Sequence, residues 1–173
     1  FGTNFLPSTR SIAFRKKVWK IVGGFPERGE NSAEDTDFNF NAIKLAVKYA
    51  RVKSAIVEWG MPQTLKEFFK KILSYAKWDA NYGDWKHPLK GLKSHNIKIS
   101  FLIIRYLFGF SVLAISFRSH SFRYIFAAGL SFYIFWSFRK VYSEFSELKA
   151  GIWGIILQFT SDLAVIAGFI YGI

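Results

Sequence analysis

The sequence predicts a small α/β part, followed by an amphipathic helix and three membrane-spanning helices. The first observation behind this prediction is that charge is separated along the chain. Residues 1–98 contain 18 Lys and Arg against 9 Asp and Glu, whereas residues 99–173 contain 6 and 3. The second is that 51% of the residues are hydrophobic and 20% aromatic, which excludes a disordered chain. A basic part therefore precedes an apolar part, and we expect the two in different solvents.

Three apolar runs predict the membrane helices. Residues 99–117 form a 19-residue run with one charge, Arg105, which at about 1.5 Å per residue spans a hydrocarbon core of about 30 Å. Residues 122–138 form a shorter run with an arginine near one end, and residues 150–173 contain one charge, Asp162. Buried helices of a soluble protein are the alternative, but three such runs leave no polar face for water.

Basic residues beside the runs predict the orientation, because cytoplasmic loops carry an excess of Lys and Arg. Four lysines precede the first run and three basic residues follow the second, whereas the turn between them holds two arginines. We therefore expect a multi-pass protein of the cell membrane. Residues 1–98 and the loop 139–149 are expected in the cytoplasm, and the C-terminus on the far face.

Three polar side chains, Arg105, Gln158 and Asp162, fall within the expected spans. Polar groups in lipid pair with one another or mark a functional site. The sequence leaves two readings open for Arg105 and Asp162: an interhelical pair without a chemical role, or a role in binding substrate.

Residues 1–60 show the local order helix, loop, helix, strand, which is typical of part of an α/β layer. The first helix is expected at 11–22 and is stopped by Gly23 and Gly24. The second opens near Ser32, and residues 52–59 have strand character.

Glu34, Asp35 and Asp37 form an acidic cluster within this basic part. Carboxylates at a helix start either complement the positive end of the helix or provide a general base. Spacing alone favours the first interpretation.

Three segments in fixed order favour the second interpretation, a general base: residues 7–16 (PSTRSIAFRK), 22–27 (VGGFPE) and 33–39 (AEDTDFN). Together they closely resemble the second half of the catalytic domain of family 2 glycosyltransferases, and the resemblance covers about residues 4–85. It implies a GT-A-type domain with a mixed sheet, of which residues 1–60 are the C-terminal portion. The donor-binding half and the aspartate-rich metal motif are expected before Phe1, so that this chain alone is expected to be incomplete and inactive.

The resemblance also implies an inverting transfer from a nucleotide sugar to a lipid-linked or glycan acceptor. Asp35 is implied as the base that deprotonates the acceptor hydroxyl, with Glu34 beside it. A divalent cation, Mg²⁺ or Mn²⁺, is implied for the complete enzyme, with ligands mostly outside this chain. Arg10, Arg15 and Lys16 are candidates for binding the diphosphate, and solvated surface charge is their alternative interpretation.

Processive members of the family carry a Q-x-x-R-W motif, and the nearest match is S-Y-A-K-W at residues 74–78, which lacks the Gln and has Lys for Arg. Processive synthesis is therefore not indicated. Tyr75, Lys77 and Trp78 either line the acceptor site or anchor the chain at the membrane interface.

Residues 61–98 are expected to form an amphipathic, interfacial region before the spans at 99–173. Apolar residues recur at helical spacing from Thr64 to Trp78, and Thr64 and Glu67 predict a capping box. The apolar face of this helix is expected either on a membrane surface or on the catalytic domain.

Composition excludes several other classes of protein. The absence of Cys excludes disulfide frameworks and thiolate sites, and three His leave little for a histidine metal cluster. A net charge of +12 raises the question of nucleic acid, but no nucleic-acid-binding signature is present. The expected partners are a nucleotide sugar, the acceptor and membrane lipids. A catalytically silent, membrane-anchored binding or scaffold fragment is the alternative function.

Overall fold

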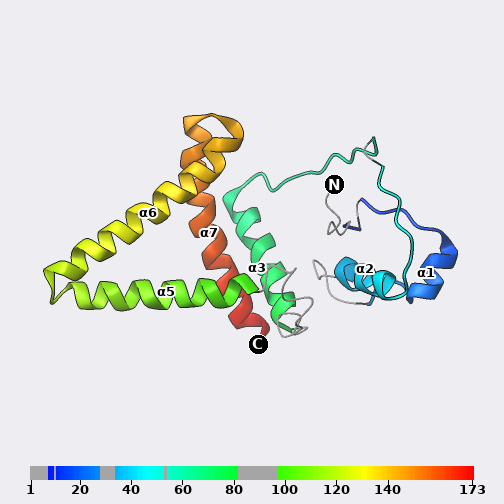
Figure 1. Cartoon of the computed structure of the whole chain (residues 1–173), viewed down its shortest axis with the longest axis horizontal. Helices are drawn as coiled ribbons and strands as arrows, with labels where there is room; N and C mark the ends of the chain where they lie inside the picture. The colour runs from blue at the N-terminus through cyan, green and yellow to red at the C-terminus, as the bar shows by residue number, and fades with distance from the viewer. Residues whose placement is uncertain (1–7, 10, 28–33, 53, 82–96) are drawn as a thin grey trace. The chain divides into compact units, whose positions relative to one another are not determined.

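The computed structural model describes residues 8–9, 11–27, 34–52, 54–81 and 97–173. The chain forms two compact units that divide between Pro62 and Gln63 (Figure 1), and each is described by itself.

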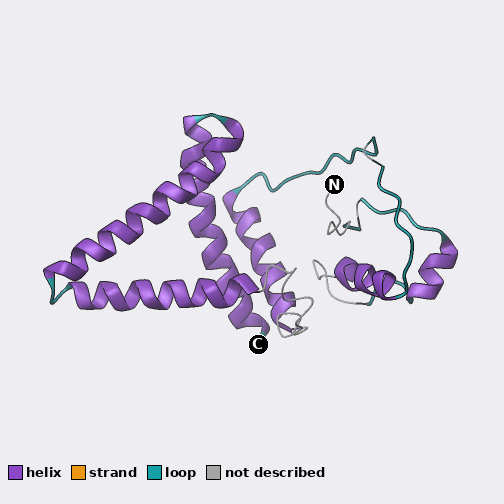
Figure 2. Ribbon diagram, in the orientation of Figure 1, coloured by secondary structure: helices purple, strands orange, loops and turns teal. Residues whose placement is uncertain are grey.

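All regular structure in these described residues is helical (Figure 2). The prediction of an α/β part is therefore wrong. Residues 52–59, expected as a strand, form no strand and are exposed wherever they are described. A strand is stable only where its N–H and C=O groups pair with a neighbouring strand, and the described part of the chain offers no such partner.

The first unit contains α1 (Lys16–Val22) and α2 (Glu34–Lys44). Helix α1 begins later than expected, because Ser11 instead closes a turn in which its N–H donates to the carbonyl of Ser8 at 2.9 Å. The predicted stop at Gly23 and Gly24 is confirmed. Both glycines have positive φ, 91° and 74°, and both N–H groups donate to the carbonyl of Trp19.

Four aromatic rings pack together in and around the core of this unit. Phe38 is 2% exposed and its ring lies 4.8 Å from that of Phe25, which meets Trp19 edge-on at 4.9 Å. Phe14 stacks on Trp19 at 5.3 Å. Gly24 lies so close to the Trp19 ring that an added Cβ would come within 2.9 Å of it. The Gly-Gly-Phe segment therefore ends α1 and also packs the core.

The second unit contains α3 (Leu65–Asn81), α5 (Ile97–Ser116), α6 (His120–Phe145) and α7 (Leu148–Gly172). The predicted capping of α3 by Thr64 is confirmed, since the Glu67 N–H donates to Thr64 Oγ1 at 3.1 Å. The Glu67 carboxylate accepts from the Gln63 N–H at 2.9 Å, one residue before the position that a standard capping box uses.

Helix α3 lies along α7, and the two helices run in the same direction (Figure 1). Gly168 and Gly172 of α7 face Ala76 and Ala80 of α3. A Cβ added at Gly168 would lie 2.3 Å from the carbonyl oxygen of Leu73, so the two backbones are in direct contact. The apolar face of α3 therefore has α7 as its partner, which the sequence analysis did not anticipate.

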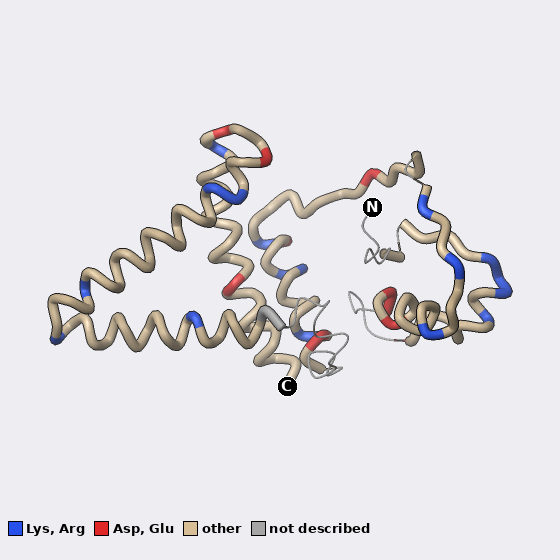
Figure 3. The backbone as a smooth tube through the Cα atoms, in the orientation of Figure 1, with Lys and Arg blue, Asp and Glu red and all other residues tan. Residues whose placement is uncertain are grey.

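Two helices are long and apolar enough to cross a membrane, judged by length and composition: α5 over Ile99–Ser116, and α7. Few charged residues interrupt their central turns (Figure 3). Helix α6 contains the expected run 122–138 but does not meet the same criterion. Its stretch between Arg123 and Arg139 has 15 residues, about 22 Å of helix, which is shorter than a hydrocarbon core of about 30 Å.

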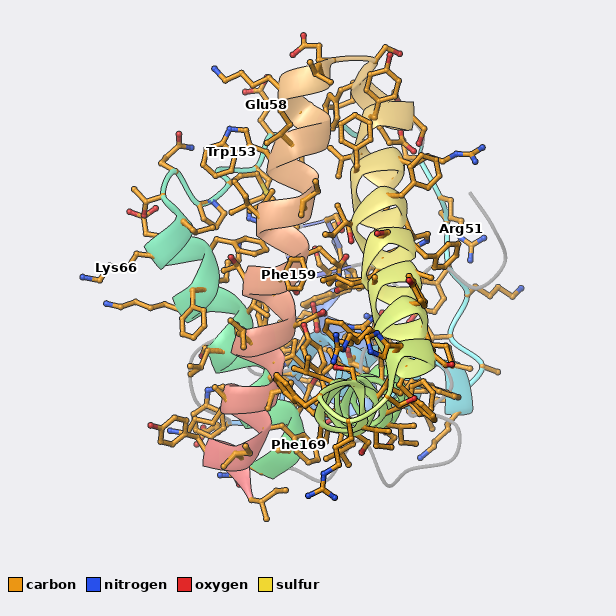
Figure 4. The ribbon with its side chains drawn as sticks, turned by 90° about the vertical axis from the view of Figure 1, so that its left-hand side faces the viewer. Arg51, Glu58, Lys66, Trp153, Phe159 and Phe169 are labelled. Atoms are coloured by element: carbon orange, nitrogen blue, oxygen red, sulfur yellow. The ribbon has the colours of Figure 1, made fainter. Side chains whose placement is uncertain are left out.

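The start of α5 and the end of α7 lie together. Ile99, Phe169 and Ala80 are buried in one cluster, with Leu102 and Val165 packed against it. Figure 4 labels Phe169 near the lower end of α7. These contacts join the start of α5 to the last turns of α7, where α5 runs across α7 and not alongside it (Figure 1).

Candidate functional site

Asp35, the base implied by the family resemblance, is the second residue of α2 and is half-buried. Its Oδ2 accepts a hydrogen bond from the backbone N–H of Thr9 at 3.3 Å. Two of the three resemblance segments, which are 26 positions apart at these residues, therefore meet at this carboxylate. The positive end of the α2 dipole adds to the stabilisation of its charge.

A buried amide supports the turn that carries Asp35. Asn39 is 1% exposed, and its Nδ2 donates to the backbone carbonyl of Asp35 at 2.8 Å. The Tyr49 hydroxyl donates to Asn39 Oδ1 at 3.3 Å. Partial burial raises the pKa of Tyr49 above its usual 10.0, which keeps this hydroxyl a donor at neutral pH. The first turn of α2 is thereby tied to the segment that follows the helix.

The acidic neighbours of Asp35 do not assemble a metal site. Glu34 and Asp37 lie in the same first turn, are half-buried and take part in further interactions. Among the residues that the structure describes, no group of three or more His, Cys, Asp or Glu has the geometry to hold a metal ion. The expectation of Mg²⁺ or Mn²⁺, with ligands mostly outside this chain, stays a prediction.

The implied substrate-binding residues that the structure describes are divided between the two units. Arg15 is exposed at the N-cap of α1, next to the exposed Lys16, and Arg10 lies outside the described residues. Tyr75, Lys77 and Trp78 belong to the second unit, where they are half-buried on α3. The Lys77 ammonium lies 5.6 Å from the centre of the Trp78 ring, within the range of a cation–π contact.

A second polar site lies among α5, α6 and α7. Asp162 of α7 is 3% exposed. Its Oδ2 accepts hydrogen bonds from Arg105 Nη2 at 2.6 Å and from the Tyr106 hydroxyl at 3.0 Å, both on α5, and from the Tyr133 hydroxyl on α6. Its Oδ1 accepts from Gln158 Nε2 at 3.0 Å. Of the two readings that the sequence leaves open for Arg105 and Asp162, the structure shows the interhelical pair, and a role in binding substrate stays a hypothesis.

Burying a carboxylate costs free energy of desolvation, and the attraction of one charged partner rarely compensates for that cost. The four hydrogen-bond donors on this carboxylate supply the additional stabilisation. Tyr106 and Tyr133 were not among the predicted site residues. Tyr106 adjoins Arg105, and Tyr133 interrupts an apolar run, so both were visible as polar groups in expected spans. Their common partner depends on how three helices pack, and no periodicity in the sequence reports that.

A cavity of about 560 Å³ opens beside this cluster, between α5 and α6. Arg105, Tyr106 and Tyr133 contribute polar groups to its wall, and most of the remaining lining is apolar. Phe159 of α7 also lines it, and its ring meets Tyr133 edge-on at 5.2 Å. Figure 4 shows Phe159 on the side of α7 that faces α6.

The first unit thus presents one held carboxylate, and the second presents a buried ion pair beside an apolar cavity. Comparison of the chain with protein-family models, with curated proteins and with solved structures found no match.

Proposed function

We propose that this chain is part of a membrane-bound glycosyltransferase that moves a sugar from a nucleotide sugar to a lipid-linked or glycan acceptor, with inversion and with Asp35 as general base. The contact between Thr9 and Asp35 carries the proposal. This contact joins the segment that contains Arg15 to the Glu-Asp pair of α2. Such a contact is needed if the two segments form one active site.

The chemistry needs a carboxylate within hydrogen-bond reach of the acceptor hydroxyl. Asp35 accepts the hydroxyl proton while the acceptor oxygen attacks the anomeric carbon. The bond from that carbon to the diphosphate breaks on the opposite face, and the nucleoside diphosphate leaves with the bonding electrons. Because a carboxylate has about four lone-pair sites, the Thr9 amide leaves Asp35 able to accept this proton. The hydrogen bond from Asn39 holds the turn, so the carboxylate is oriented before the acceptor binds.

We further propose that α5 and α7 cross the cell membrane and that the first unit faces the cytoplasm. The lysine-rich segment before α5 supports this orientation. Because Ile99 and Phe169 pack together, two crossing helices place the C-terminus on the same side as the start of α5. This differs from the far-side C-terminus that the basic-residue count predicts. Helix α6 then has both ends on the outer side, where its Tyr and Trp residues suit the membrane interface.

The test compares Asp35→Asn with Asp37→Asn in the complete enzyme that contains this chain, supplied with a panel of nucleotide sugars. Asp35→Asn keeps the side-chain shape and an oxygen acceptor, so we expect a loss of stability within about 1 kcal/mol. Release of nucleoside diphosphate should fall about 10²–10⁴-fold, the usual contribution of a general base. Asp37→Asn is the matched control in the same turn and should retain most of the turnover.

The same measurement separates the proposal from its alternative. Turnover of Asp35→Asn within about threefold of wild type would return Asp35 to the capping role that spacing alone suggests. No turnover of any nucleotide sugar by the wild-type enzyme would favour the silent, membrane-anchored scaffold.

A further inference from the structure

The cavity between α5 and α6 has the character of a ligand site. Its volume of about 560 Å³ falls within the range of roughly 300–1,000 Å³ that is usual for small-molecule sites. Phe110, Val112 and Phe126 are among its apolar lining residues, and Arg105 is its one charged lining residue among those described. A cavity of this kind suits a molecule with a long apolar part and one polar group.

Arg105 has hydrogen-bond donors to spare. A guanidinium carries five N–H groups, and in the described part of the chain Asp162 is its hydrogen-bond acceptor, through Nη2. The ring of Tyr133 lies 4.6 Å from the guanidinium carbon, but a ring face replaces few of the missing acceptors. The Arg105 side chain is 43% exposed. At the proposed depth in the membrane, unpaired N–H groups of a cation are costly, so an acceptor from outside the chain would stabilise Arg105.

Asp162 does not need a further partner, because Arg105, Tyr106, Tyr133 and Gln158 already donate to it. What the site lacks is oxygen acceptors for Arg105. A phosphate offers several in a geometry that matches the guanidinium fork. We propose that the cavity binds one membrane phospholipid, with an acyl chain between α5 and α6 and its phosphate on Arg105. This inference rests on the proposed membrane location, and it is independent of sugar transfer.

Two glycines leave the space that the acyl chain requires. Gly109 of α5 and Gly129 of α6 both line the cavity, and a Cβ added at either would meet nothing within 4 Å. A leucine at one of these positions therefore fills part of the cavity without displacing the hydrogen bonds around Asp162.

The test counts lipids bound to the purified full chain by native mass spectrometry, in detergent micelles with equal amounts of phosphatidylglycerol and diacylglycerol of identical acyl chains. Wild type should retain one phosphatidylglycerol and prefer it over diacylglycerol about tenfold, as expected for a charge-assisted hydrogen bond. Gly129→Leu should lower retention of both lipids about tenfold. Ala128→Leu adds the same side chain at the adjacent exposed residue outside the lining and should behave as wild type.

Arg105→Gln should abolish the preference for phosphatidylglycerol over diacylglycerol, since the fork and its charge are gone. The proposal fails if wild type retains no lipid, if Gly129→Leu retains as much as Ala128→Leu, or if the preference survives in Arg105→Gln. Release of the chain from membranes by alkaline extraction would refute the membrane location, and the lipid site with it, without bearing on turnover.

Discussion

Replacement of Gly168 by alanine tests the close contact between α7 and α3 in the second unit. The new Cβ would lie 2.3 Å from the carbonyl oxygen of Leu73 and 2.9 Å from the Cβ of Ala76, whereas ordinary contacts begin at 3.4 Å. A backbone oxygen in the middle of α3 cannot rotate away. The helices must therefore separate locally by about 1 Å, which is enough to forfeit a large part of the dispersion attraction across the interface.

Two opposing terms set the magnitude. Overpacking of this kind costs about 1–3 kcal/mol, whereas removing a glycine from a helix interior gains about 1 kcal/mol. We expect Gly168→Ala to lower the free energy of unfolding by up to about 2 kcal/mol. Gly129→Ala is the matched control, because its Cβ meets nothing within 4 Å. It should gain stability by up to about 1 kcal/mol.

The assay is denaturant unfolding of the full chain in detergent, followed by helical circular dichroism. The two variants should differ by about 1–3 kcal/mol, the overpacking cost, because the gain from removing a helical glycine is common to both, with Gly168→Ala the less stable. Equal midpoints for Gly168→Ala and Gly129→Ala would refute the close packing of α3 on α7. Gly151→Ala provides an intermediate case, because its Cβ would meet the Phe138 ring, a side chain that can turn aside.

Three other predictions follow from the described contacts. Asp162→Asn should lower the free energy of unfolding by about 3–5 kcal/mol, because it leaves the charge of Arg105 without its partner. The double variant with Arg105→Gln should recover part of that loss, and the pairing would be refuted if the effects of the two single substitutions simply added up in the double variant. Because the pKa of Tyr49 is raised in the folded state, its contribution to stability is fully present below about pH 10 and is lost as pH rises further. The difference in unfolding midpoint between wild type and Tyr49→Phe should therefore stay constant up to about pH 10 and shrink above it, and a constant difference throughout would contradict this. Reporter tags after Ile173 and at Phe145 should lie on opposite membrane sides, with the first cytoplasmic; a far-side tag after Ile173 would favour the topology that the basic residues predict.

Local signals in the sequence predicted local structure well. Glycines with positive φ ended α1 where Gly23 and Gly24 predicted, and Thr64 and Glu67 capped α3. Length and apolar content located α5 and α7, since both properties can be counted along the chain. The pair of Arg105 and Asp162 followed from the cost of leaving either charge alone in lipid.

Features that depend on a distant partner were not predictable in this way. Residues 52–59 have the composition of a strand, but pairing decides whether a strand forms, and the described residues offer none. Helix α6 contains an apolar run, but its aromatic and serine residues lower the mean hydropathy of that run. A prediction based on the absence of charge does not take this lower hydropathy into account. Asn39 reads as a poor helix former until its burial and its contact with the Asp35 carbonyl are known. The catalytic assignment of Asp35 stays a prediction.

The pairing of α3 with α7 also has a consequence in time. Ala76 precedes Gly168 by about 90 residues, so synthesis at about 5–20 residues per second leaves α3 without its partner for roughly 5–20 s. A helix of this length forms within about a microsecond, and its basic, amphipathic character favours adsorption to a membrane surface. We therefore expect nascent α3 to rest on the membrane first and to transfer its apolar face to α7 when that helix arrives.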